Sequence, residues 1–262
     1  METIKRAYNE IRYYVDEQAN STTWNNKVLP SNNNREAWYA EWDDKYMTGL
    51  LNSKVVKKAL KKIADSYYGE RLDEILKDAT ELTDCSFPNL NRVYVDCCSI
   101  LGMYNHPKAY VTNRIKGVNA LSVEVCDKQL ILISPQVAIW LSEKEQSFLL
   151  GHEISHHQQG NLVCHTVSGI VERINNKDEL LGTLINDAID IPLKRWCRCS
   201  EFNADRGGFL CCKDIDSVKS LFNRIEDDVY LNDFKDILEL SNGHPLIKTR
   251  LDMINHYARM VI

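Results

Sequence analysis

A chain of 262 residues, 44% of them hydrophobic, is long enough to bury the core of one large domain. Its formal net charge of −5 argues against nucleic acid as a partner, because phosphate binding requires a basic surface. The longest apolar stretch, LILISPQVAIWL, is interrupted by polar residues and is shorter than the roughly 20 residues that a membrane span needs, so we expect none.

The nine cysteines indicate a reducing compartment rather than a disulfide framework. Their number is odd, no CxxC pair is present, and the N-terminus lacks the apolar segment of a signal peptide. We therefore expect a cytoplasmic location, in which most of these thiols serve as small buried hydrophobic side chains.

The first part of the chain is predicted to be helical. Hydrophobic periodicity favours helices over residues 3–18, 35–51 and 53–69, with Ser53 as the N-cap of the third helix and Gly69 as its C-terminal stop. Five lysines between residues 54 and 62 are interpreted as a solvated helix face rather than a basic docking surface.

The pattern then changes to short apolar runs, which indicate strands at 93–95, 109–111, 120–125 and 130–134. The sequence CDKQ after the third run is typical of a short turn. We expect a small, mostly antiparallel sheet whose strands are mainly linked by hairpins. Helices are expected again from this sheet to the end of the chain.

The first of these helices is predicted to begin at a capping box, with Ser142 as N-cap and Glu145 three residues later. The helix then runs without proline into GHEISHH at 151–157, which holds three of the seven histidines of the chain. The histidines are therefore expected to project from a helix.

His152 and His156 are one helical turn apart on the same face, so both imidazoles can reach one metal ion. Glu153 lies about 100° around the helix from His152, where a carboxylate can contact a water on the metal without replacing a ligand. This is the H-E-x-x-H arrangement of zinc peptidases. His157 points in another direction and is interpreted as a surface or hydrogen-bonded histidine.

A catalytic zinc needs a third protein ligand. The extended metzincin motif is excluded because Gln159 and Leu162 stand where it requires glycine and histidine. Glu201 is the favoured ligand, since Asp205 lies one helical turn further on and can orient a ligand histidine. The rival carboxylates that stay open are Glu172, Glu179, Asp187 and Asp190.

Four motifs in order resemble the HtpX-like zinc peptidases, a gluzincin family that also contains the type I CAAX prenyl proteases and the Oma-type peptidases. They are NALSV, LSEKEQSFLLGHEISHH, SEFNADRGG and, near the end, GHPLIKTRLDMI. The resemblance implies that His152, His156 and Glu201 bind one zinc ion per chain. It also implies that Glu153 is the general base and that Asp205 supports a ligand from behind.

The same resemblance implies roles for three further residues. Asn119 and Ala120 match the strand beside the cleft, along which a substrate backbone is expected to lie as an added strand. His244 matches the late His-Pro motif and is a candidate for steadying the transition state, with Arg250 following at the family's spacing.

Together these features predict an α+β gluzincin-like domain over residues 85–262, with its sheet over the H-E-x-x-H helix and helices elsewhere. Residues 1–84 are expected to pack on this domain or to regulate it, and they offer a surface for a regulatory protein partner. The predicted function is that of a soluble zinc endopeptidase acting on proteins or peptides. Alternatives are a catalytically silent, zinc-stabilised peptide-binding module and a regulatory protease of the repressor-cleaving type.

Overall fold

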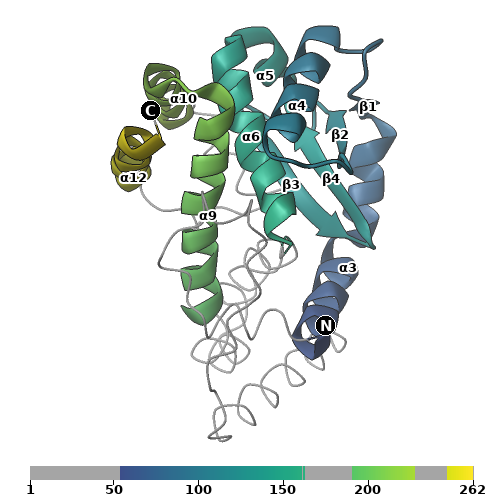
Figure 1. Ribbon diagram of the computed structural model, residues 1–262. Coiled ribbons are helices and arrows are strands. Elements are labelled where there is room, and N and C mark those ends of the chain that lie inside the picture. The colour runs from purple at the N-terminus through teal and green to yellow at the C-terminus, as the bar shows by residue number, and fades with distance from the viewer. Residues whose placement is uncertain (1–53, 161, 163–190, 228–246, 262) are drawn as a thin grey trace, which may run out of the picture.

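The computed structural model describes residues 54–160, 162, 191–227 and 247–261 (Figure 1). The predicted helices over 3–18 and 35–51, and the predicted N-cap Ser53, lie outside these residues. The strands are β1 (Thr80–Glu81), β2 (Lys108–Val111), β3 (Ala120–Val125) and β4 (Lys128–Ile133). The helices are α3 (Lys54–Lys77), α4 (Pro88–Ile100), α5 (Pro135–Trp140), α6 (Glu143–Gln159), α9 (Ile191–Cys212), α10 (Ile215–Asp227) and α12 (Ile247–Val261).

The four strands form one mixed sheet in the order β1-β2-β4-β3. The antiparallel hairpin of β3 and β4 is confirmed, with Cys126 and Asp127 in its two-residue turn at positive φ. Strand β2 pairs with β4 in parallel, and the short β1, which was not predicted, pairs with β2 in antiparallel orientation. With helices making up most of the remaining described chain, the α+β fold class is confirmed.

The predicted strand at 93–95 is wrong, because these residues lie in the middle of helix α4. Pro88 suits the first turn of a helix, where its missing N–H costs nothing. The buried side chains then recur at the three- and four-residue spacing of a helix, which outweighs the strand propensity of the VYV triplet. They are Leu90, Val93, Tyr94, Cys97 and Cys98.

Helix α3 does not stop at Gly69 as predicted but continues to Lys77. Leu72 and Ile75 are buried and extend the apolar face that begins at Ala59 and Leu60, so packing overrides the weak helix propensity of glycine. A Cβ at Gly69 would lie 3.2 Å from Cys126 Sγ, which explains the small residue at this point of close approach.

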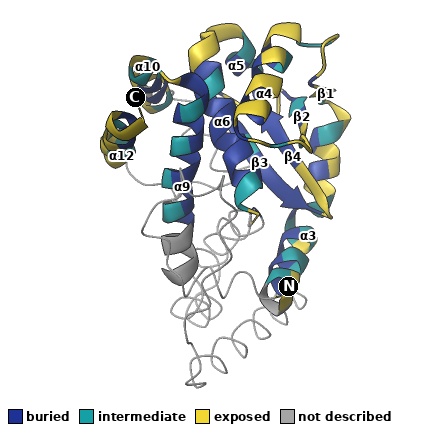
Figure 2. Cartoon of the chain, in the orientation of Figure 1, coloured by how far each residue is buried: buried dark blue, intermediate teal, exposed yellow. Residues whose placement is uncertain are grey.

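The two faces of the sheet are covered by different helices. Ile131 and Ile133 belong to a core shared with α4, α6 and α9, whereas the alternate residues Leu130 and Leu132 point to the other face. Helix α3 packs against β3, and its buried side chains belong to this second face. Figure 2 shows most of α6, together with β3 and the second half of β4, as buried, whereas β1 is exposed.

Helix α6 begins at the predicted capping box, which is confirmed. Ser142 Oγ accepts a hydrogen bond from the Glu145 backbone N–H, and Glu145 Oε2 accepts one from the Ser142 N–H at 2.8 Å. Glu145 also binds Ser220 and Arg224 of α10. Burial would raise the pKa of Glu145, but these hydrogen bonds and the Arg224 charge lower it. The N-terminus of α6 is therefore fixed from two sides.

Candidate metal centre

Helix α6 brings its first two motif histidines together. His152 and His156 are buried, and their Nε2 atoms lie 3.1 Å apart. Their rings meet edge to face with centroids 4.7 Å apart. The one-turn spacing therefore directs both lone-pair nitrogens to a common point, as the helical phase predicted.

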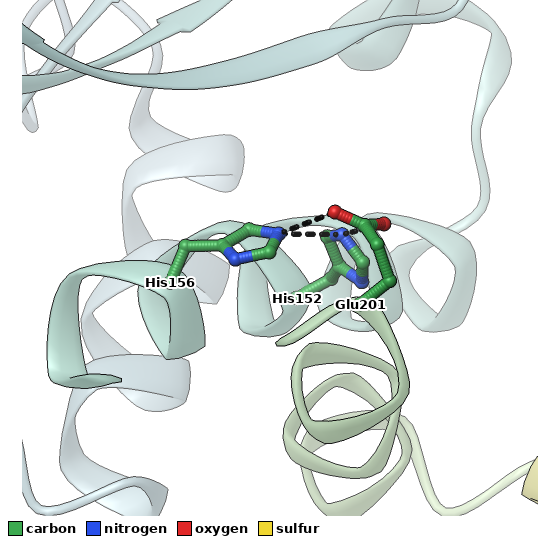
Figure 3. Close-up of side chains that lie close together, drawn as sticks. All are labelled: His152, His156 and Glu201. Atoms are coloured by element: carbon green, nitrogen blue, oxygen red, sulfur yellow. Dashed lines mark hydrogen bonds and ion pairs between the residues drawn. The ribbon is translucent and has the colours of Figure 1, made fainter. Parts of the chain in front are cut away.

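Glu201 reaches the same point from α9 (Figure 3). Its Oε1 lies 3.2 Å from His156 Nε2, and its Oε2 lies 3.5 Å from His152 Nε2. One ligand atom from each residue falls within 4.8 Å of the others, and all three residues are buried. Two histidines and a glutamate are thus assembled from helices that are distant in sequence.

The spacing of these atoms fits a tetrahedral zinc ion. Zinc–nitrogen and zinc–oxygen bonds of about 2.0–2.1 Å at tetrahedral angles separate neighbouring ligand atoms by about 3.3 Å. The separation of 3.1 Å between the two Nε2 atoms and that of 3.2 Å between His156 Nε2 and Glu201 Oε1 lie close to this value, and the second Glu201 oxygen, Oε2, lies 3.5 Å from His152 Nε2. Three protein ligands also leave a fourth position free, which is the donor set of catalytic rather than structural zinc sites.

Close packing of α6 on α9 brings Glu201 to this point. At Gly207 of α9, a Cβ would lie 1.8 Å from Ser155 Oγ, and at Gly208 it would lie 2.6 Å from the Phe148 carbonyl oxygen. Neither position has room for a side chain, so the two backbones approach closely. Figure 1 shows the two helices side by side, with α6 between α9 and the sheet.

Asp205 supports His152 from behind, in the place predicted for it. Asp205 Oδ1 lies 3.0 Å from His152 Nδ1, and because the carboxylate accepts, Nδ1 carries the proton and Nε2 is left free to bind a metal. Arg250 of α12 clamps the same carboxylate with two hydrogen bonds of 2.6 and 2.8 Å. Its guanidinium also stacks over the Phe222 ring of α10.

The charges around these side chains favour a bound cation. Burial would lower the pKa of His152, but the hydrogen bonds to Asp205 and Glu201 overcome this effect and raise it to about 10. Burial would raise the pKa of Asp205, but the Arg250 charge and its hydrogen bonds, with a smaller contribution from His152, lower it. Without a metal, the carboxylates of Asp205 and Glu201 therefore stabilise the protonated, positively charged form of His152.

His156 has a comparable support that the sequence reasoning missed. Ser200 Oγ lies 3.4 Å from His156 Nδ1 and donates to Gln159 Oε1 at 2.6 Å. Ser200 directly precedes Glu201 in α9, so when Glu201 approaches the two histidines, Ser200 also lies near them and contacts His156. This adjacency in sequence is the signal that could have indicated the contact. The link between Arg250 and Asp205 was also missed, although Arg250 had been recognised at the family's spacing.

The remaining predicted site residues divide into two groups. Glu153 is buried in α6 and is not part of the candidate ligand cluster. Ala120 is the first residue of β3, and Asn119 directly precedes it. His244 lies outside the described residues, as do the four rival carboxylates between residues 172 and 190. The roles predicted for these residues stay predictions.

His157 is also outside the ligand cluster. It is buried, not a surface residue, and burial lowers its pKa to about 4, so its ring is neutral near pH 7.

Compared with known protein families, the chain matches peptidase family M48 over residues 85–258, which is more than half of its length. The chain belongs to peptidase family M48. The M48 match includes the whole of α4, α6, α9 and α10 and therefore all three converging side chains, and it confirms the predicted metallopeptidase family. M48 peptidases depend on zinc, so the donor set and the family agree. No curated protein and no solved structure matches the chain.

Within the described ranges, none of the helices of this M48 peptidase is both long and apolar enough to cross a bilayer.

Proposed function

We propose that this M48 peptidase is an endopeptidase that cuts peptide bonds within proteins or peptides, using one zinc ion per chain held by His152, His156 and Glu201. The observation that supports this best is the convergence of their three ligand atoms within 4.8 Å in a buried position. The support of His152 by Asp205, and of Asp205 by Arg250, is what a zinc-binding histidine requires to present one nitrogen.

The chemistry divides between the metal and the chain. Zinc, when bound, supplies a Lewis acid that polarises the scissile carbonyl and lowers the pKa of a water toward about 7. Glu153 accepts the proton of that water and passes it to the leaving amine. Arg250 keeps Asp205 ionised, so that Asp205 holds the proton on His152 Nδ1 throughout the reaction.

Strand β3 supplies the proposed binding site for the substrate backbone. In the described part of the chain, β3 pairs with β4 along one edge and with no strand along the other. An extended peptide can add to this open edge through main-chain hydrogen bonds, beginning near Asn119 and Ala120. A role of His244 in steadying the transition state stays a prediction.

The odd number of cysteines supports a cytoplasmic location for the protein.

A peptide-library digest tests this function against the alternative of a silent peptide-binding module. The full-length protein, purified with zinc, is expected to cut library peptides, to lose this activity when a chelator removes the metal, and to regain it when zinc is restored. A catalytically silent module would retain peptides in a pull-down, with or without zinc, and release no fragments.

A further inference from the structure

The open edge of β3 can be assigned to particular backbone groups. The Ser134 N–H donates to the Asn119 carbonyl at 2.9 Å, so the opposed pair Asn119 and Ser134 is hydrogen-bonded across the hairpin. In an antiparallel ladder such pairs alternate with pairs that make no hydrogen bonds to each other. In the observed register, the N–H and C=O groups of Ala120, Ser122 and Glu124 therefore point away from β4, toward the open edge.

The side chains of these three residues differ in what they touch. Ser122 is buried, and its Oγ donates a hydrogen bond of 2.9 Å to the carbonyl oxygen of Glu153. The Glu124 carboxylate forms an ion pair with Lys61 of α3 at 2.9 Å, and Ala120 has no polar side-chain atom. Ser122 thus joins the open strand edge to the helix turn that carries the proposed general base.

We propose that Ser122 is a positioning residue for the hydrolysis, an inference that rests on the proposed function. Its backbone faces the peptide that adds to β3, while its hydroxyl fixes the Glu153 turn of α6 relative to that same backbone. Ser122 then sets the distance between the scissile bond and the Glu153 carboxylate more directly than the general packing of β3 on α6 does. Misplacement by about 1 Å can cost on the order of a hundredfold in rate, so even partial loss of this link is measurable.

The test compares Ser122→Ala with wild type in the full-length, zinc-loaded protein, with a fluorogenic peptide taken from the library digest. We expect kcat to fall about tenfold while KM stays within twofold, because the variant keeps every backbone group of the ladder. Zinc content is expected to match the wild type, because Ser122 contacts no ligand atom. The thermal unfolding midpoint is expected to fall by only about 2–4 °C, because one buried hydrogen bond is lost. A readout without turnover is the Kd of the same peptide for Glu153→Gln with and without Ser122→Ala, which is expected to be unchanged.

Two variants separate this role from a general effect of losing a hydroxyl. Ser122→Thr keeps the donor and is expected to restore kcat to within threefold of wild type. Ser147→Ala removes a hydroxyl of α6 that donates to the Glu143 carbonyl of its own helix, and is expected to leave kcat unchanged. An unchanged kcat in Ser122→Ala, or a loss that accompanies lower zinc content or weaker peptide binding, overturns the inference. A zinc-loaded wild type that cuts nothing overturns the proposed function and this inference together.

Discussion

At the scale of single residues, Glu201 carries the prediction that best tests the ligand set. Its carboxylate is the one acid in the described residues that meets both histidines, so Glu201→Ala is expected to lower zinc content from one ion per chain to less than half after dialysis. Metal analysis by mass spectrometry measures this directly. Glu226→Ala, at an exposed position of α10, is the matched control and is expected to keep its zinc. Full zinc retention in Glu201→Ala would remove this residue from the ligand set.

Helical phase correctly predicts which histidines of α6 come together. His152 and His156, at positions i and i+4, share a face and converge, whereas His157 lies outside the cluster. The sequence favours Glu201 through Asp205 one turn later and through the family resemblance, but its approach to the histidines depends on how α9 packs on α6 across Gly207 and Gly208. The contact of Ser200 with His156 is a consequence of the same crossing, so no local pattern indicated it.

At the scale of elements, the cap of α6 predicts how stability depends on pH. Glu145→Gln keeps the shape of the side chain but removes the charge that binds Arg224, and is expected to lower the free energy of unfolding at pH 7 by about 1 kcal/mol. Because folding lowers the pKa of Glu145 below its ordinary value of 4.5, this contribution is fully present above that pH. It is lost as the pH falls through the lowered value.

Urea unfolding of both proteins at several pH values checks this prediction. The difference between wild type and Glu145→Gln is expected to be constant from pH 7 to about pH 5 and to shrink below it. A difference that stays constant through the acidic range would show that the charge of Glu145 contributes nothing. Glu226→Gln again provides the exposed control.

The crossing of α6 and α9 makes a second prediction at this scale. In Gly208→Ala the new Cβ would lie 2.6 Å from the Phe148 carbonyl oxygen, which is backbone and cannot turn aside. The helices must separate, and we expect a loss of about 1–3 kcal/mol in stability together with weaker zinc binding, because Glu201 moves with α9. Chemical denaturation and a competitive chelator titration measure the two effects. Gly69→Ala in α3, where the Cβ meets only a cysteine side chain, is expected to keep wild-type zinc affinity.

Element prediction from sequence failed for physical reasons that can be named. The VYV triplet has strand propensity, but its helix is specified by the spacing of buried residues over the thirteen residues of α4. Glycine often ends a helix, yet α3 continues past Gly69. The burial of Leu72 and Ile75 stabilises the helix by more than the low helix propensity of glycine destabilises it. The parallel pairing of β2 with β4 joins segments that are not hairpin neighbours, and periodicity contains no information about such pairing.

At the scale of the whole molecule, the candidate metal centre lies within the part of the chain that matches family M48, whereas α3 and β1 precede that part. Both nevertheless belong to the fold, since β1 extends the sheet and α3 packs against β3. The division into a helical segment over 1–84 and a catalytic domain over 85–262 stays a prediction, and so does a partner surface on the N-terminal residues.

The most direct measurement of the central claim is zinc content and peptide cleavage for wild type and Glu153→Gln, prepared in parallel. The substitution removes the proposed base but leaves His152, His156 and Glu201 in place. We predict one zinc ion per chain in both proteins, with cleavage by the wild type and a loss of at least a hundredfold in kcat in the variant. Equal cleavage by the two proteins would contradict the role of Glu153, and absence of zinc from the wild type would contradict the metal centre itself.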